Sequence, residues 1–134
     1  MGEPVRMMPI FLYGTLLDPC LLAAKSGDAA LIRRAVPALL PGYRRVLLRG
    51  TPYPMLLPDP RARVEGLLLP RIGPRALGRL AAYEGPPYRL APVRVLTPRG
   101  PRRAWAWLTP RWRADAACAW HPPPPRPPRG HARP

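Results

Sequence analysis

Short apolar runs separated by turns rich in glycine and proline recur along the chain up to residue 108. Residues 9–13 form the first run, and Gly14 closes it, which predicts a buried strand that enters a tight turn. Runs of similar length follow and predict further strands. They cover residues 30–36, 43–48, 63–69, 88–96 and 102–108. Many short strands of this kind indicate a sheet or barrel at the centre of the fold.

The breaks between these strands have recognisable turn chemistry. Pro41-Gly42 and Pro58-Asp59-Pro60 predict turns, and residues 50–54 predict a rigid loop because two prolines fix φ and donate no N–H. Residues 98–101 predict the turn of a hairpin between the last two strands. Within the strand at residues 63–69, Gly66 indicates a bulge or the close approach of another backbone.

Two segments have helix signals at both ends. Asp18 followed by proline is typical of an N-cap and a first helical residue, and Gly27 ends the helix predicted over residues 19–25. A second helix is predicted over residues 74–84, where apolar residues recur at spacings of three and four. The sequence Gly85-Pro86-Pro87 cannot continue it.

The C-terminal part of the chain changes in character. A short additional helix is expected over residues 111–120. In residues 121–134, 7 of 14 positions are proline, and the segment has no apolar cluster to bury. An extended or disordered tail is therefore predicted. We therefore expect one folded domain, residues 1–120, followed by this Pro/Arg-rich tail. The expected fold class is α+β, a small mixed β-barrel or sheet with short peripheral helices.

The composition is strongly basic, with 22 basic against 7 acidic residues and a formal net charge of +15. All basic residues except Lys25 are arginine, and they are scattered over strands and loops. Nucleic-acid binding is one interpretation of such a charge, but it usually comes with clustered cations and a recognisable motif. The scatter favours compositional bias instead, with an acidic partner or an oligomer contact as further alternatives. The oligomeric state stays open.

Several other classes of protein and site are disfavoured. No apolar run approaches the roughly 18 residues of a membrane span, and the N-terminal residues do not resemble a signal peptide. Cys20 and Cys118 are far apart and outside any CxxC pattern, so a reduced, cytoplasmic chain is expected. His121 and His131 lie in the proline-rich tail. We expect no metal and no cofactor.

Two local features point to chemistry. Glu84 ends the second predicted helix, where the helix dipole and partial burial would raise the pKa of its carboxyl group and suit it to general acid–base catalysis. A solvated surface carboxylate is the simpler alternative for a lone Glu at a helix end. In Tyr13-Gly14-Thr15-Leu16, the glycine allows consecutive backbone N–H groups to converge on an anion or a carbonyl oxygen. An ordinary strand-to-helix connection is the alternative there.

Several segments of the chain, taken in order, resemble the γ-glutamylcyclotransferase-like (AIG2-like) superfamily, and specifically its bacterial members. The first of these segments is Phe11-Leu12-Tyr13-Gly14-Thr15-Leu16, and the resemblance extends over residues 9–108. The later ones are Pro41-Gly42-Tyr43-Arg44, Tyr53-Pro54-Met55-Leu56, Val64-Glu65-Gly66-Leu67-Leu68, Leu80-Ala81-Ala82-Tyr83-Glu84-Gly85, Tyr88-Arg89 and Ala104-Trp105-Ala106-Trp107. The ordered set is more specific than any one of its pieces.

This resemblance implies a small mixed β-barrel and a reaction. The α-amine of a γ-glutamyl amine or peptide attacks its own γ-carbonyl, which yields 5-oxoproline and a free amine. Tyr13, Gly14, Thr15 and Leu16 would hold the glutamyl group through backbone N–H and C=O groups. Glu84 would take a proton from the α-ammonium group and pass it to the leaving amine.

Other positions either extend this implied site or depart from the family pattern. Tyr53 and Tyr88 either line the cavity or only pack, and Arg89 pairs with Glu84, with a substrate carboxylate or with another surface group. Ala81 stands where the family often has Asp, and Trp107 where it often has Tyr. Because of these two losses, an alternative stays open, in which the protein binds a small molecule in the same cavity without catalysis.

Overall fold

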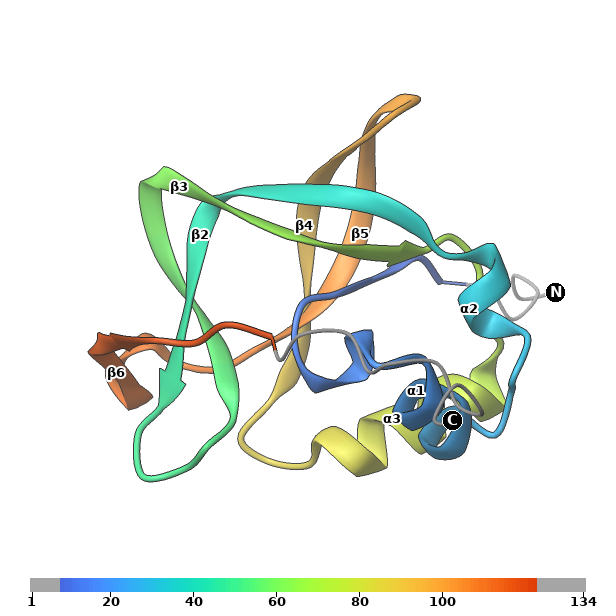
Figure 1. The fold of residues 1–134 in the computed structure, drawn as a ribbon, viewed down its shortest axis with the longest axis horizontal. Coiled ribbons are helices and arrows are strands. Elements are labelled where there is room, and N and C mark those ends of the chain that lie inside the picture. The colour runs from blue at the N-terminus through green and yellow to red at the C-terminus, as the bar shows by residue number, and fades with distance from the viewer. Residues whose placement is uncertain (1–7, 123–134) are drawn as a thin grey trace, which may run out of the picture.

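The structure is a computed structural model that describes residues 8–122; residues 1–7 and 123–134, which include most of the predicted tail, lie outside the described part. Six strands form one sheet, and short helices lie at one end of it (Figure 1). The strands are β1 (Ile10–Leu12), β2 (Val36–Leu48), β3 (Pro54–Leu69), β4 (Arg89–Thr97), β5 (Gly100–Leu108) and β6 (Ala114–Ala119). The helices are α1 (Pro19–Ser26), α2 (Leu31–Arg34) and α3 (Pro74–Glu84), with single 3-10 turns η1 (Thr15–Leu17) and η2 (Arg111–Arg113).

The sheet closes into a barrel. Its order is β3-β1-β5-β4-β2-β6, and β3 also pairs with β2, so that β3, β1, β5, β4 and β2 form a ring. All these pairs are antiparallel except β1 with β5, where Ile10 lies opposite Trp105. β6 continues the sheet outside the ring, beside β2. This small mixed barrel with peripheral helices confirms the expected fold class.

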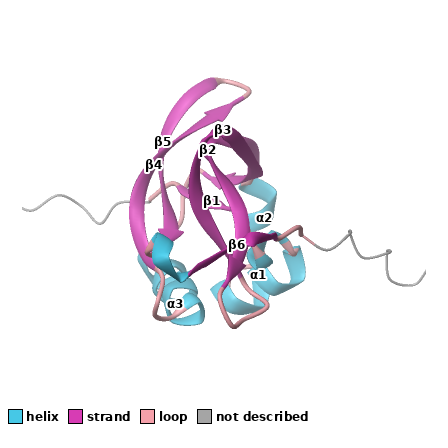
Figure 2. Cartoon of the chain, turned by 90° about the vertical axis from the view of Figure 1, so that its left-hand side faces the viewer, coloured by secondary structure: helices cyan, strands magenta, loops and turns pink. Residues whose placement is uncertain are grey.

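Alternating side chains of the barrel strands supply two apolar layers. Phe11 belongs to the cluster inside the barrel, together with Leu40 and Leu68. Ile10 and Leu12, on the opposite face of β1, pack in a second cluster with residues of the helices. Figure 2 shows these helices at one end of the strands. β1 is therefore buried on both faces, which explains why its sequence is an unbroken apolar run.

The close approach predicted at Gly66 is present. Gly66 lies in β3 opposite Ala38 of β2, and a Cβ atom built on it would overlap the carbonyl oxygen of Leu12 and lie 2.7 Å from Cζ of Phe11. Only glycine at this position leaves room for the backbone of β1 to lie so close to β3.

The predicted strand over residues 30–36 is wrong at its start. Residues Leu31–Arg34 form α2, and β2 begins at Val36. The carboxylate of Asp28 accepts a hydrogen bond from the backbone N–H of Ala30 (2.9 Å) and also contacts Arg34 (3.3 Å). This local side-chain turn, which precedes α2, favours a helical turn over an extended backbone.

The predicted turns at Pro41-Gly42 and Pro58-Asp59-Pro60 are also wrong, since both lie within long strands. The β2–β3 register shifts between Pro41 and Tyr43, and Gly42 has a positive φ of 87°. Pro58 and Pro60 of β3 lie at or beside this bulge, where the ladder is interrupted and a missing N–H costs little.

The helix expected over residues 111–120 is a third error, because only Arg111–Arg113 are helical there and β6 follows. β6 pairs with the end of β2, where Leu48 lies opposite Ala114. By contrast, the two longer helices and the hairpin of β4 and β5 are confirmed. The Asp18 side chain caps α1 at the N–H of Cys20, and Gly27 ends the helix with φ of 74°.

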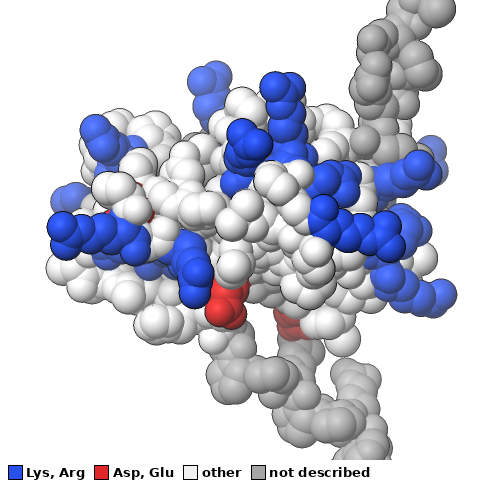
Figure 3. Space-filling model, turned by 90° about the horizontal axis from the view of Figure 1, so that it is seen from above, with Lys and Arg blue, Asp and Glu red and all other residues white. Residues whose placement is uncertain are grey.

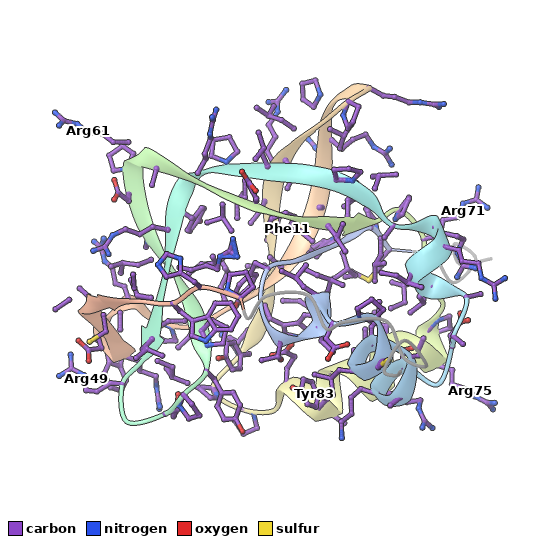
Figure 4. All side chains as sticks on the ribbon, viewed as in Figure 1. Phe11, Arg49, Arg61, Arg71, Arg75 and Tyr83 are labelled. Carbon is purple, nitrogen blue, oxygen red and sulfur yellow. The ribbon has the colours of Figure 1, made fainter. Side chains whose placement is uncertain are left out.

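The basic side chains are spread over the surface. Figure 3 shows Lys and Arg across the whole face that is seen from above, with few acidic groups among them. Arg49, Arg61, Arg71 and Arg75 point outward at separate edges of the molecule (Figure 4). Between residues 8 and 122, no helix is long and apolar enough to cross a membrane.

Candidate active site

A cavity of about 170 Å³ opens where β1 ends, between the barrel and α3. Its lining comes from four segments that are far apart in sequence, and most of its walls are aromatic or apolar. The lining residues are Phe11, Leu12, Tyr13, Gly14, Thr15, Leu16, Tyr53, Pro54, Tyr83, Glu84, Tyr88 and Trp107.

The segment after β1 forms one wall of the cavity. The Tyr13 side chain is buried in the barrel, and its hydroxyl donates to the carbonyl oxygen of Trp107 in β5 (2.6 Å). Burial raises the pKa of Tyr13 well above its ordinary value, so this hydroxyl stays protonated and acts as a donor. At Gly14 a Cβ atom would lie 2.8 Å from Cγ of Pro54. The hydrogen bond of Tyr13 thus holds this wall in place, and the lack of a side chain at Gly14 lets Pro54, the first residue of β3, approach it.

The backbone of this wall presents free donors. The N–H of Leu17 donates to the carbonyl oxygen of Gly14 (3.0 Å), which begins the 3-10 turn. The first N–H groups of a helical turn have no partner within it, so those of Thr15 and Leu16 remain for a ligand. The carbonyl oxygen of Tyr13 already accepts from the guanidinium group of Arg45 (3.2 Å).

Glu84 lies in the opposite wall, as the last residue of α3. It has no ion pair or hydrogen bond to its carboxyl group within residues 8–122. Burial raises the pKa of this carboxyl group from 4.5 to about 7. A carboxyl group with this pKa takes up and releases a proton near neutral pH, which is the property that a general acid–base catalyst needs.

The remaining wall is aromatic. The Tyr88 hydroxyl donates to the carbonyl oxygen of Pro54 (2.6 Å), which joins the start of β4 to the start of β3. The pKa of Tyr88 is raised, first by burial and then by the nearby carboxyl group of Glu84. Tyr53 is 51% exposed and lies at the rim.

The structure brings most of the sequence-predicted site residues to one place. Those that line the cavity are Tyr13, Gly14, Thr15, Leu16, Tyr53, Glu84 and Tyr88. Arg89 is exposed and is not part of the lining, and the ion pair considered between Arg89 and Glu84 is absent from the described residues. Ala81 is exposed as well, so the missing Asp side chain does not leave a gap in the wall.

Sequence reasoning missed Tyr83 as a site residue. Its hydroxyl lies 2.8 Å from Oγ1 of Thr15, across the cavity wall. In the sequence, Tyr83 stands out only as the residue before Glu84 in a motif. No local pattern shows which side chain of α3 meets the loop after β1. Trp107, considered only as a departure from the family pattern, also lines the cavity. Within residues 8–122, no group of three or more His, Cys, Asp or Glu side chains is placed to hold a metal ion.

The family follows from comparison with known proteins. A family model described as "Gamma-glutamyl cyclotransferase, AIG2-like" matches residues 10–123. The chain belongs to this family. Protein AIG2 C of Arabidopsis thaliana is 31% identical to it over 87 residues, which cover 65% of this chain and 51% of that protein.

Two solved structures show the same architecture. A solution structure of an Arabidopsis thaliana protein has a TM-score of 0.72 and 24% identity, and the match covers 89% of this chain and 78% of that one. A structure titled "Gamma-glutamyl cyclotransferase" has a TM-score of 0.62 and 17% identity, over 76% of this chain and 66% of that one. At these identities the likeness concerns the fold alone.

The relatives also limit what the family match says. The chain spans about half the length of the curated relatives it matches. Those relatives are plant proteins, so the comparisons do not support the bacterial type that the sequence resemblance suggested.

Proposed function

We propose that the protein cyclises the γ-glutamyl group of a small γ-glutamyl amine or peptide to 5-oxoproline and releases the amine. The observation that carries this proposal is Glu84, a carboxyl group without a partner in the described residues that shares a cavity with the backbone of residues 13–16. The family match supports the same reaction class. The substrate would reach the cavity past Tyr53.

Glu84 moves the proton in this scheme. Its carboxylate takes a proton from the α-ammonium group of the substrate, and the free amine then attacks the γ-carbonyl carbon of the same molecule. The new C–N bond closes a five-membered ring. Collapse of the tetrahedral intermediate breaks the bond to the leaving amine. Glu84 passes to this amine the proton from the α-ammonium group and then the second proton that the ring nitrogen loses, so that the amine leaves as an ammonium ion. The reaction consumes no water.

Positioning supplies much of the acceleration. An intramolecular attack has a high effective concentration once the amine and the carbonyl group are held in line. The cavity of about 170 Å³ is small enough to hold the glutamyl group in a folded conformation. The N–H groups of Thr15 and Leu16 would donate to oxygen atoms of that group, including the oxyanion of the intermediate.

Trp107 favours a second candidate function, which is binding of a small molecule without turnover. The indole ring fills a place in the cavity where the family often has a Tyr hydroxyl, so one polar group is missing. In this alternative the cavity still accepts a γ-glutamyl compound, but the ring closure is not catalysed.

A product assay distinguishes the two functions. Purified protein is incubated with γ-glutamyl amines and γ-glutamyl dipeptides, and 5-oxoproline and the released amine are quantified. We expect both products in equal amounts from at least one compound. Binding without product formation favours the second candidate, and the absence of both contradicts the proposal.

The raised pKa of Glu84 also predicts a pH dependence of stability. Its pKa is about 7 in the folded protein and about 4.5 in the unfolded chain. Between these values the folded protein holds a proton that the unfolded chain lacks, so the free energy of unfolding falls as the pH rises. Glu84→Gln removes this effect. We expect the variant to match the wild type near pH 4 and to be more stable by about 2 kcal/mol at pH 8.

Urea denaturation at pH 4, 6 and 8 measures this difference. The matched control is Glu65→Gln, which removes an exposed carboxylate outside the cavity. A stability difference between Glu84→Gln and wild type that stays constant over this pH range contradicts the prediction.

A further inference from the structure

The contact between Tyr83 and Thr15 joins the two halves of the site. Thr15 belongs to the loop after β1, and Tyr83 immediately precedes Glu84 in α3. Their hydroxyl oxygens are 2.8 Å apart, and both residues line the cavity. In Figure 4, Tyr83 is seen on α3, beneath the barrel strands.

The hydroxyl groups of Thr15 and Tyr83 have one more donor hydrogen than the bond between them uses. Two hydroxyl groups bring two donor hydrogens, and the bond between them uses one. Neither hydroxyl donates to any other group within residues 8–122. One O–H donor is therefore left over, whichever of the two oxygens accepts, and the pair faces the cavity.

Tyr83 is held from its other side. The ammonium group of Lys25, the chain's single lysine, lies 5.4 Å from the centroid of the Tyr83 ring. A cation over the face of an aromatic ring stabilises this arrangement. Lys25 comes from α1, so the Tyr83 ring is fixed by two elements besides its own helix.

We propose that the Thr15 hydroxyl donates to an oxygen atom of the bound glutamyl group and that Tyr83 is the positioning residue that orients it. The inference rests on the proposed function and adds a side-chain donor to the backbone groups already described. When Tyr83 donates to Oγ1 of Thr15, the threonine hydrogen is free to turn into the cavity. A chain of two hydroxyls then donates more strongly than a single one.

The test is a double-mutant cycle on kcat and KM, with the γ-glutamyl compound that the wild type converts best. Thr15→Val keeps the shape and removes the hydroxyl, and we expect kcat/KM to fall by about 10- to 100-fold. Thr15→Ser keeps the hydroxyl and should retain activity within about threefold. Tyr83→Phe should lower kcat/KM by about 3- to 10-fold.

The decisive variant is Thr15→Val combined with Tyr83→Phe. If Tyr83 acts through Thr15, the double variant loses no more activity than Thr15→Val alone. Independent, multiplied losses overturn the positioning role. Tyr43→Phe, at a tyrosine outside the cavity lining, is the matched control, and the thermal midpoint of each variant separates a folding defect from a lost donor.

Failure of the inference and failure of the proposed function have different signatures. A wild type that converts γ-glutamyl compounds while Thr15→Val is unimpaired overturns only the inference. If the wild type converts none of these compounds, the inference is tested by binding instead. Calorimetry then measures the affinity of the wild type and the Thr15 variants for L-glutamate. A tenfold loss in Thr15→Val that is restored in Thr15→Ser supports the hydroxyl donor, and equal affinities contradict it.

Discussion

Glu84→Gln is expected to lower kcat/KM for the cyclisation of γ-glutamyl compounds by about 10²- to 10⁴-fold, the usual contribution of a positioned general acid–base group. Glutamine has nearly the same shape as glutamate but cannot take the proton from the α-ammonium group. The carboxyl group has no ion pair or hydrogen bond within residues 8–122, so the substitution breaks no contact there. The loss should appear in kcat more than in KM.

The pH profile gives this prediction a second readout. With a pKa of about 7 in the free protein, ionisation of Glu84 should make kcat/KM rise with pH through neutrality, and this limb should vanish in Glu84→Gln. Glu65→Gln serves again as the control for loss of one carboxylate. Equal 5-oxoproline production by wild type and Glu84→Gln would falsify the assigned role.

Gly66→Ala is expected to destabilise the fold by about 3 kcal/mol, at the upper end of the range for overpacked cores. The added methyl group would overlap the carbonyl oxygen of Leu12, and backbone cannot move aside as a flexible side chain can. It would also lie 2.7 Å from Cζ of Phe11, which is fully buried. β1 would have to shift, and the segment after it forms one wall of the cavity.

Gly78→Ala is the matched control for this substitution. Gly78 lies within α3, and a Cβ atom there meets nothing within 4 Å. In a helix the same change should stabilise the protein by roughly 0.5–1 kcal/mol. Urea denaturation compares the two variants with wild type. A Gly66→Ala midpoint within error of the wild type contradicts the close packing of β1 on β3.

Predictions from sequence succeeded where the signal was local. Asp18 and Gly27 mark the ends of α1 because a cap and a left-handed residue act within a few positions. The error at Pro58-Asp59-Pro60 arose where a distant partner strand decides the backbone. The error at residues 30–36 is an exception, because the contact of Asp28 that favours α2 is local as well. Two prolines predict a turn, and they fit in a strand because four residues of β3, 59–62, lie opposite the single residue Gly42 of β2.

The candidate site follows the same division. Tyr13, Gly14 and Glu84 were found because each belongs to a short ordered motif, and the fold brings these motifs to one cavity. Arg89 directly follows a cavity residue in sequence, yet strand alternation turns its side chain away. Tyr83 could not be identified, because its role depends on the crossing of α3 with the loop that follows β1.

The parallel pairing of β1 with β5 has a consequence for synthesis on the ribosome. Ile10 lies opposite Trp105, and the hydroxyl of Tyr13 is bound by the carbonyl oxygen of Trp107. β1 can pair with β3 earlier, but its other edge waits for β5 and stays unpaired in the meantime. A nascent chain cut short before residue 105 has no completed barrel and no cavity. Any ligand of this cavity is thus bound only after β5 has been made.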